Sequence, residues 1–124
     1  MLRTALLKSG HVSEKAIHKA VIEWATAHPK LRGLVLHVPN EGKRTRSYGK
    51  LLKDMGMIAG ISDLFIAMGR RGFYGAWIEL KSCGGKLSIS QKEFLFKMNQ
   101  QNYYTAVCWS LEEAINIISW YCDI

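Results

Sequence analysis

The residues best suited to chemistry lie in the run Ala76-Trp77-Ile78-Glu79-Leu80-Lys81, which is typical of a β-strand. Side chains alternate across a strand, so Glu79 and Lys81 share one face while Leu80 lies on the other. A glutamate and the backbone carbonyl of Leu80 offer the oxygen ligands that a hard cation such as Mg²⁺ prefers. Lys81 would then lie beside a metal-bound water or a scissile phosphate. The run predicts a metal-assisted hydrolytic site.

A second carboxylate, Asp63, opens the preceding strand directly after Gly60-Ile61-Ser62, where small residues would let the backbone approach a ligand. The run Gly69-Arg70-Arg71-Gly72 predicts a turn that joins the two strands as an antiparallel hairpin. The start of one strand then meets the end of the next, so Asp63 should lie beside Glu79 and Lys81. Alone, the aspartate would be taken for a cap and the Glu-Lys pair for a solvated ion pair. The hairpin that joins them favours a catalytic interpretation.

Two further polar residues favour the same interpretation. Glu14 lies on the apolar stripe of the first predicted helix, where an unpaired charge would be costly. Its alternative role is a first-turn glutamate that complements the helix dipole. Gln91 lies on the core stripe of a later helix, and its alternative role is a capping box with Ser88.

A basic segment follows the first strand. The chain carries 17 lysines and arginines against 10 carboxylates, a formal charge of +7, which predicts a polyanionic partner. The densest run should pass from a loop into a short helix that Gly56 ends. It would contact nucleic-acid phosphates through five residues; a solvated charged helix is the alternative. The five are Lys43, Arg44, Arg46, Lys50 and Lys53.

Caps, breakers and periodicity predict the elements that must position these residues. The first helix should begin after Ser13 and stop at Pro29. Ser88 and Ser90 compete to cap a later helix, and Ser110 opens the last one, which runs to about residue 121. The order of helices and strands predicts an α/β fold with a mixed β-sheet flanked by helices. The strands are expected at residues 34–38, 63–68, 74–81 and 103–109.

Size and composition set the broad class. A chain of 124 residues with 48% apolar residues fits one folded domain over residues 1–124. Its three cysteines form no CxxC pair, which argues against a disulfide framework or a structural zinc site and favours a cytoplasmic setting. The first residues are too short and too charged for a signal peptide. No apolar run approaches the ~20 residues of a membrane span.

The ordered set of motifs resembles a known family. Glu14 on a first helix, then Gly60-Ile61-Ser62-Asp63, Glu79-Leu80-Lys81 and Leu87-Ser88-Ile89-Ser90-Gln91, is similar to the VRR-NUC family. This is the virus-type replication-repair nuclease branch of the PD-(D/E)XK superfamily. The likeness covers nearly the whole chain, from about residue 12 to residue 118.

The resemblance implies a restriction-endonuclease-like PD-(D/E)XK core and hydrolysis that depends on Mg²⁺ or Mn²⁺ and leaves 5′-phosphate ends. It implies that Asp63 and Glu79 bind metal and that Lys81 positions or activates water. Glu14, which could reach the metal through a water, and Gln91 would support the site. A serine, Ser62, stands where the superfamily pattern has proline.

The resemblance also suggests a substrate and a partner. Single-domain members occur in phages and bacteria and resemble dimeric Holliday junction resolvases, which implies branched DNA and a homodimer in a bacterial or phage-infected cell. Two alternatives stay open: a non-catalytic nucleic-acid-binding module on a nuclease fold, or a nuclease for flaps or RNA. The last helix bears apolar residues on more than one face, which would cover either its own core or a partner chain: Ile117, Ile118, Trp120, Tyr121 and Ile124.

Overall fold

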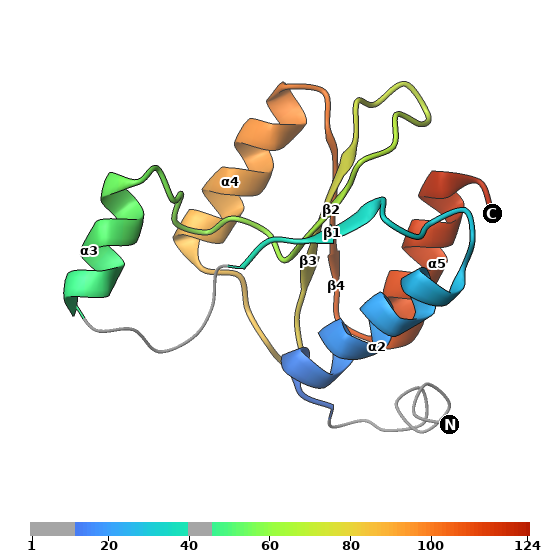
Figure 1. Cartoon of the computed structure of the whole chain (residues 1–124), viewed down its shortest axis with the longest axis horizontal. Coiled ribbons are helices and arrows are strands. Elements are labelled where there is room, and N and C mark those ends of the chain that lie inside the picture. The colour runs from blue at the N-terminus through green and yellow to red at the C-terminus, as the bar shows by residue number, and fades with distance from the viewer. Residues whose placement is uncertain (1–11, 40–45) are drawn as a thin grey trace.

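The computed structural model describes residues 12–39 and 46–124 (Figure 1). Helices and strands follow one another in the predicted order, with strands shorter at their ends than expected. The elements are α2 (Glu14–Ala27), β1 (Val35–His37), α3 (Arg46–Asp54), β2 (Leu64–Ile66), β3 (Ala76–Leu80), α4 (Ile89–Gln100), β4 (Tyr104–Cys108) and α5 (Leu111–Cys122).

The four strands form one sheet in the order β1-β2-β3-β4. β1 and β3 both pair with β2 in antiparallel fashion, whereas β4 runs parallel to β3. The parallel pair needs a crossover connection, and α4 supplies it. The predicted mixed sheet and the β2–β3 hairpin are therefore confirmed.

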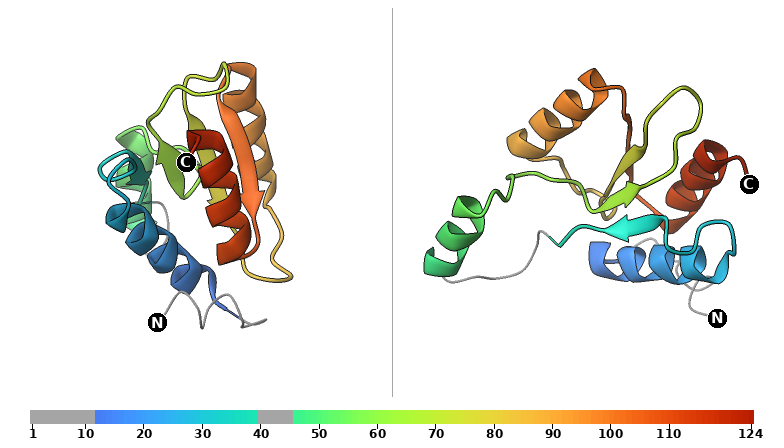
Figure 2. Two further views of the ribbon diagram at one scale, coloured as in Figure 1. Left: turned by 90° about the vertical axis from the view of Figure 1, so that its right-hand side faces the viewer. Right: turned by 45° about the horizontal axis from the view of Figure 1, so that its top comes forward.

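Helices cover the sheet from both sides (Figures 1 and 2). α2 and α5 pack on the face that holds the main core, where Leu64 and Ile78 are fully buried. Cross-strand neighbours Phe65 and Trp77 occupy the opposite face, and the Trp77 ring meets Phe94 of α4 at a centroid distance of 5.0 Å. The alternation of side chains along β2 and β3 thus separates the two layers.

The helix caps follow the sequence closely. The Ser13 hydroxyl accepts a hydrogen bond from a backbone N–H of the first turn of α2, and Ser110 does the same for α5. At α4 the cap is Ser88 rather than Ser90. The Ser88 hydroxyl accepts from the Gln91 N–H at 3.1 Å, and the Gln91 side chain accepts from the Ser88 N–H at 2.8 Å. This is a complete capping box.

The last helix closes over its own core. Ile118 and Tyr121 are fully buried, and the Tyr121 hydroxyl donates to the carbonyl of Met68 at 2.8 Å. Trp120 is exposed, yet the Arg71 guanidinium lies 4.1 Å from its ring centroid. Within the described ranges, no helix combines the length and the apolarity that a membrane crossing demands.

α3 stands apart from the sheet and its three covering helices (Figures 1 and 2). None of its residues is buried. Gly56, at a φ of +98°, follows its end as predicted. Two residues of the expected basic segment, Lys43 and Arg44, lie outside the described residues.

Candidate active site

The β2–β3 hairpin brings Asp63 to the end of β3. Leu64 pairs with Ile78, so the residue before β2 lies opposite the last residues of β3. One oxygen of the Asp63 carboxylate, Oδ2, accepts a hydrogen bond from the backbone N–H of Leu80 at 2.8 Å. This bond fixes the orientation of the carboxylate beside the strand end. The predicted juxtaposition of Asp63 with Glu79 and Lys81 is observed.

Glu79 is a buried acid. Only 2% of the residue is exposed, and its Oε1 atom has no hydrogen-bond partner among the described residues. Burial raises the pKa of the Glu79 carboxyl from its ordinary value of 4.5 to about 9, and hydrogen bonding to Asp63 and the negative charge of Asp63 add to the effect. The charge of Lys81 opposes the rise in pKa. A buried carboxylate of this kind requires a proton or a cation to compensate it.

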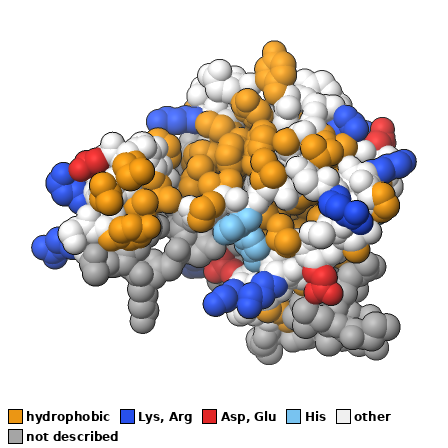
Figure 3. Space-filling model, viewed as in Figure 1, with side chains coloured by type: hydrophobic (Ala, Val, Ile, Leu, Met, Phe, Trp, Pro, Cys, Tyr) orange, Lys and Arg blue, Asp and Glu red, His pale blue; other side chains and the backbone are white. Residues whose placement is uncertain are grey.

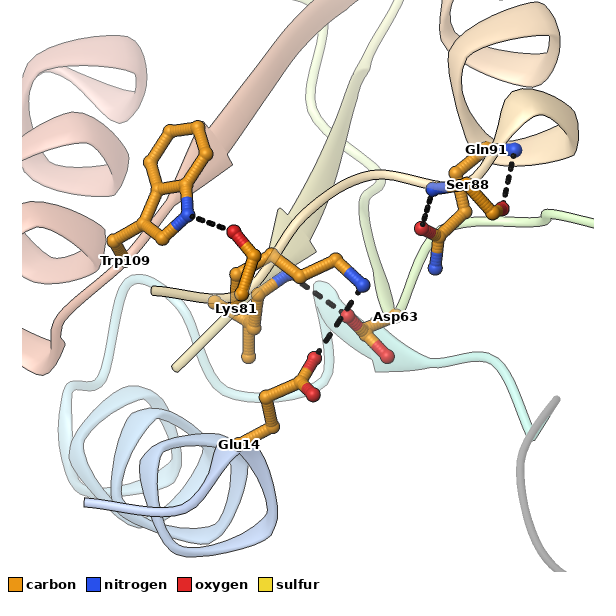
Figure 4. A network of polar contacts seen from close by, with 8 residues as sticks. Glu14, Asp63, Lys81, Ser88, Gln91 and Trp109 are labelled. Atoms are coloured by element: carbon orange, nitrogen blue, oxygen red, sulfur yellow. Dashed lines mark hydrogen bonds and ion pairs between the residues drawn. The ribbon is translucent and has the colours of Figure 1, made fainter. Parts of the chain in front are cut away.

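The Lys81 side chain points its amine toward Asp63 and Glu14 (Figure 4). The residue is 8% exposed, and its Nζ lies 3.7 Å from Oε1 of Glu14 on α2. Its backbone N–H donates to the Cys108 carbonyl at 2.8 Å, which extends the β3–β4 pairing by one residue. The lysine is thus held by the sheet at one end and by an ion pair at the other.

Glu14 and Gln91 lie at the border of the site rather than inside it. The prediction of a buried Glu14 is wrong, because 49% of its side chain is exposed. The residue still faces Lys81 from the first turn of α2, since the helix begins there. The Gln91 side chain takes the alternative role expected of it, in the capping box of α4.

Gly60 explains how α4 comes near Asp63. It has a φ of +79°, and a Cβ built on it would lie 2.3 Å from the carbonyl carbon of Ser90. The loop before Asp63 therefore touches the backbone of the first turn of α4, a contact that only glycine permits. We expected the small residues here to let the backbone approach a ligand; at Gly60 the close neighbour is α4.

These groups line one cleft of about 940 Å³. Its walls come from α2, β1, the loop before β2, the end of β3 and the start of α4. Both carboxylates and lysines line it, which suits a ligand that carries both phosphate and metal. The lining residues are Glu14, Lys15, His18, Lys19, Ile22, Glu23, His37, Ile61, Asp63, Glu79, Leu80, Lys81 and Gln91.

Comparison with known proteins identifies the family. A family model described as the VRR-NUC domain matches residues 11–111, most of the chain. The chain belongs to the VRR-NUC family. A solved structure described as "VRR_NUC domain protein" is 24% identical, with a TM-score of 0.79 over 91% of this chain and 90% of that one. At this identity the likeness shows the fold alone. None of the curated proteins matches.

Membership of the VRR-NUC family makes this a nuclease-type fold, and it agrees with the α/β class and the mixed sheet. The Ser62 side chain, which replaces the proline of the superfamily pattern, is fully buried. Its hydroxyl has no hydrogen-bond partner among the described residues. The serine therefore makes no polar contact here that a proline would lack.

The donor set of this VRR-NUC site fits a hard cation. Asp63 and Glu79 are adjacent, and the Oε1 atom of Glu79 is buried and unpartnered among the described residues. Among the described residues, no group of three or more His, Cys, Asp or Glu side chains is arranged to hold a metal ion. Mg²⁺ does not require one, because it keeps several waters and binds proteins through one or two carboxylates. The Leu80 carbonyl, the third oxygen predicted from the sequence, lies at the end of the same strand.

Two cleft residues were not assigned from the sequence. His18 lies one helical turn after Glu14, and His37 ends β1. Their rings meet edge to face at a centroid distance of 4.5 Å, and both line the cleft. The spacing from Glu14 to His18 was the one signal in the sequence. No pattern could link His18 to His37, because their contact depends on how α2 crosses β1.

Proposed function

We propose that the protein is a metal-dependent endonuclease that hydrolyses DNA phosphodiester bonds. The observation that carries this proposal is the Glu79 oxygen, which is buried beside Asp63 without a hydrogen-bond partner in the described chain. Leaving a buried carboxylate uncompensated costs on the order of several kcal/mol, so ionised Glu79 needs a cation at this position. A cation held between Glu79 and Asp63 would compensate it.

Asp63, Glu79 and the Leu80 carbonyl would hold Mg²⁺ or Mn²⁺, with Glu14 able to reach it through a water. Such an ion, when bound, lowers the pKa of a coordinated water and neutralises charge on the phosphate. The Leu80 N–H keeps Asp63 oriented by its 2.8 Å bond, so the carboxylate needs little reorganisation to bind. Preorganised groups of this kind account for much of the rate of many enzymes.

Lys81 supplies the cationic group of the cleft next to the two acids. Its ammonium, 3.7 Å from Glu14, would contact a non-bridging oxygen of the scissile phosphate or orient the attacking water. Water adds to phosphorus and the P–O3′ bond breaks, which yields a 5′-phosphate and a 3′-hydroxyl. Because Lys81 is mostly buried, its charge acts in a medium less polar than water and is felt more strongly by the phosphate.

Branched DNA and a homodimer complete the proposal. The net charge of +7 favours a polyanion. Arg46, Lys50 and Lys53 are exposed on α3, as a phosphate-contacting surface requires, although Lys50 also pairs with Asp54 at 2.8 Å. A four-way junction has two-fold symmetry, and a two-fold dimer would present two clefts to it.

One gel assay tests the proposal. Junction, flap, splayed-arm, single-stranded and linear duplex DNA are incubated with Mg²⁺, Mn²⁺ or EDTA, beside an RNA duplex. We expect cleavage of the junction with either metal and none with EDTA. The Asp63→Asn variant should be inactive, and the matched control Glu93→Gln, on the exposed side of α4, should be active. Binding without cleavage of any substrate would instead identify a non-catalytic module.

A further inference from the structure

α3 is amphipathic, and the large residues on its apolar side are about half exposed or more. At 100° per residue, its basic residues Arg46, Lys50 and Lys53 fall on one stripe. The opposite stripe carries Tyr48 and Leu51. Met55, which directly follows the helix, continues this stripe. Their exposed fractions are 53% for Tyr48, 50% for Leu51 and 74% for Met55. A helix of this pattern is expected to bury its apolar side against another surface.

The sheet has a partly exposed apolar strip of its own, the β1–β2 strip. Leu36 of β1 pairs with Phe65 of β2, and Phe65 pairs with Trp77 of β3, so the three share the α4 face. α4 reaches Trp77 through Phe94, whereas Leu36 remains 43% exposed and Phe65 is partly exposed. Figure 3, in the view of Figure 1, shows hydrophobic side chains gathered across the middle of the molecule and again on α3.

We propose that these two surfaces bind each other between two copies of the chain. The apolar stripe of α3 from one copy packs on the β1–β2 strip of the second, and the second returns the same contact. The interface is therefore isologous, with a two-fold axis between the copies. This inference rests on the homodimer of the proposed function and names the surface that forms it.

The chain after α3 meets α4 at Gly60, and α3 itself stands apart from its own strip. At Gly60 the backbone is pressed against the first turn of α4, as the 2.3 Å approach of a built Cβ to Ser90 shows. Figure 1 and the right-hand view of Figure 2 show α3 beyond the first turn of α4, apart from β1. A second copy can reach the strip without breaking the contact at Gly60.

The chemistry of α3 favours a protein over nucleic acid on its apolar stripe. DNA offers a row of phosphates, which would take the basic stripe and leave the apolar one in water. With a second copy on the apolar stripe, the basic stripe stays free for DNA. The two stripes thus serve two partners at once.

The apolar surface available is close to what a dimer needs. A large apolar side chain holds about 100 Å² of buriable surface, and five from each copy supply on the order of 1,000 Å². Stable interfaces bury about 1,200 Å² or more in total, so a modest polar rim completes the area. The five are Leu36, Tyr48, Leu51, Leu52 and Met55.

Cross-linking between two proteins that each carry one introduced, exposed cysteine tests the pairing. The exposed Cys83 is first replaced by serine; Cys108 and Cys122 are buried. Leu36→Cys protein is mixed with Leu51→Cys protein under mild oxidation, and we expect a disulfide-linked pair of chains. Neither protein alone should cross-link to a comparable extent, and nor should Leu36→Cys mixed with Ile89→Cys, a residue 76% exposed on α4.

A chain that carries both Leu36→Cys and Leu51→Cys separates the two arrangements. If it closes on itself at low concentration while the mixture fails to link, α3 covers its own sheet and the inference is wrong. Binding of α3 to anionic lipid vesicles, abolished by Leu51→Glu in a protein that sediments as a monomer, would also overturn it.

Sedimentation of folded variants gives an independent measure. Leu51→Glu with Met55→Glu should shift a wild-type dimer to monomer at micromolar concentration, whereas the control Ile89→Glu should remain a dimer. Circular dichroism shows whether each variant is folded. Metal-dependent nicking of DNA is assayed in parallel, since none of these residues lines the cleft. Loss of dimer with nicking retained supports this interface, and a dimer without nicking refutes the proposed function alone.

Discussion

At the scale of single residues, the Glu79 carboxyl group links the charge of the cleft to the stability of the fold. Its pKa of about 9 in the folded chain exceeds the ordinary 4.5, so the folded state holds this proton more tightly than the unfolded state does. The stabilisation is complete below pH 4.5 and is lost as the pH rises from there through about 9.

This shift predicts how the metal-free protein responds to alkali. The free energy of unfolding should fall by up to about 1.4 kcal/mol per pH unit across that window, because one proton is released. Urea unfolding in EDTA at several pH values measures the slope. Glu79→Gln should lack this part of the slope, and a wild-type slope in that variant would contradict the assignment. Added Mg²⁺ should restore stability at high pH in the wild type alone.

Asp63 combines a structural and a chemical role, and two substitutions separate them. In the wild-type chain the Leu80 N–H donates to Asp63 Oδ2 at 2.8 Å. Asp63→Asn keeps an oxygen that can accept this hydrogen bond, whereas Asp63→Ala removes the acceptor. Both variants should lose cleavage while still binding DNA. Only Asp63→Ala should lose stability, by about 1–3 kcal/mol. Equal stability of the two variants, or cleavage by Asp63→Asn, would show that the carboxylate has another role.

At the scale of elements, the contact between the β2 loop and α4 sets the shape of the cleft. Gly60→Ala would force a Cβ against Ser90. We expect about 1–2 kcal/mol of backbone strain and a further 1–3 kcal/mol or so from the clash, with slower cleavage because Asp63 shifts. The control is Gly33→Ala, at a φ of +81° with no atom within 4 Å, which should show the strain alone and full activity.

The basic stripe of α3 should determine the salt dependence of DNA binding. Arg46→Ala with Lys53→Ala should weaken binding and reduce the slope of log K against log salt by about two, near 0.9 for each lost phosphate contact. Fluorescence anisotropy across a salt series measures it. Lys92→Ala with Lys97→Ala removes the same charge from α4 and should leave the slope near the wild-type value. An unchanged slope for the α3 pair would favour a solvated helix.

Local patterns predicted most of this architecture. Ser13, Ser88 and Ser110 cap helices where their spacing indicated, because a cap depends on residues three positions away. The turn at residues 69–72 placed Asp63 beside Glu79 for a similar reason. The apolar stripe of α3 could also have been predicted, since Tyr48, Leu51 and Met55 recur at helical spacing. Only the basic residues of this segment were interpreted from the sequence.

What could not be predicted depends on where separate elements end in space. Glu14 lies on the core stripe of α2 in the sequence, yet it is the first residue of the helix and its side chain is half exposed. The contact of His18 with His37 depends on the crossing of α2 and β1. Neither the exposure of Glu14 nor the contact between the two histidines can be inferred from a local sequence pattern.

At the scale of the whole molecule, the proposed cleavage of a junction needs cuts at two symmetric positions, and the described part of each chain holds the Asp63–Glu79 cleft once. A single cleft would nick one strand and would have to rebind for the second. A homodimer joined through α3 and the β1–β2 strip would carry two clefts in fixed relation, with the basic stripes beside them. The dimer should then cut both strands within one binding event.

Mixed dimers test this expectation. Wild-type and Asp63→Asn chains are refolded together in equal amounts and supplied with a supercoiled plasmid that extrudes a cruciform. Random pairing makes about a quarter of the dimers fully active and about half of them singly active. Two nicks in one event linearise the plasmid, whereas one nick relaxes it and removes the cruciform. Linear product should therefore fall to about a quarter while nicked circles become the main product. A ratio of linear to nicked product equal to that of the wild type alone would mean that each chain cuts independently.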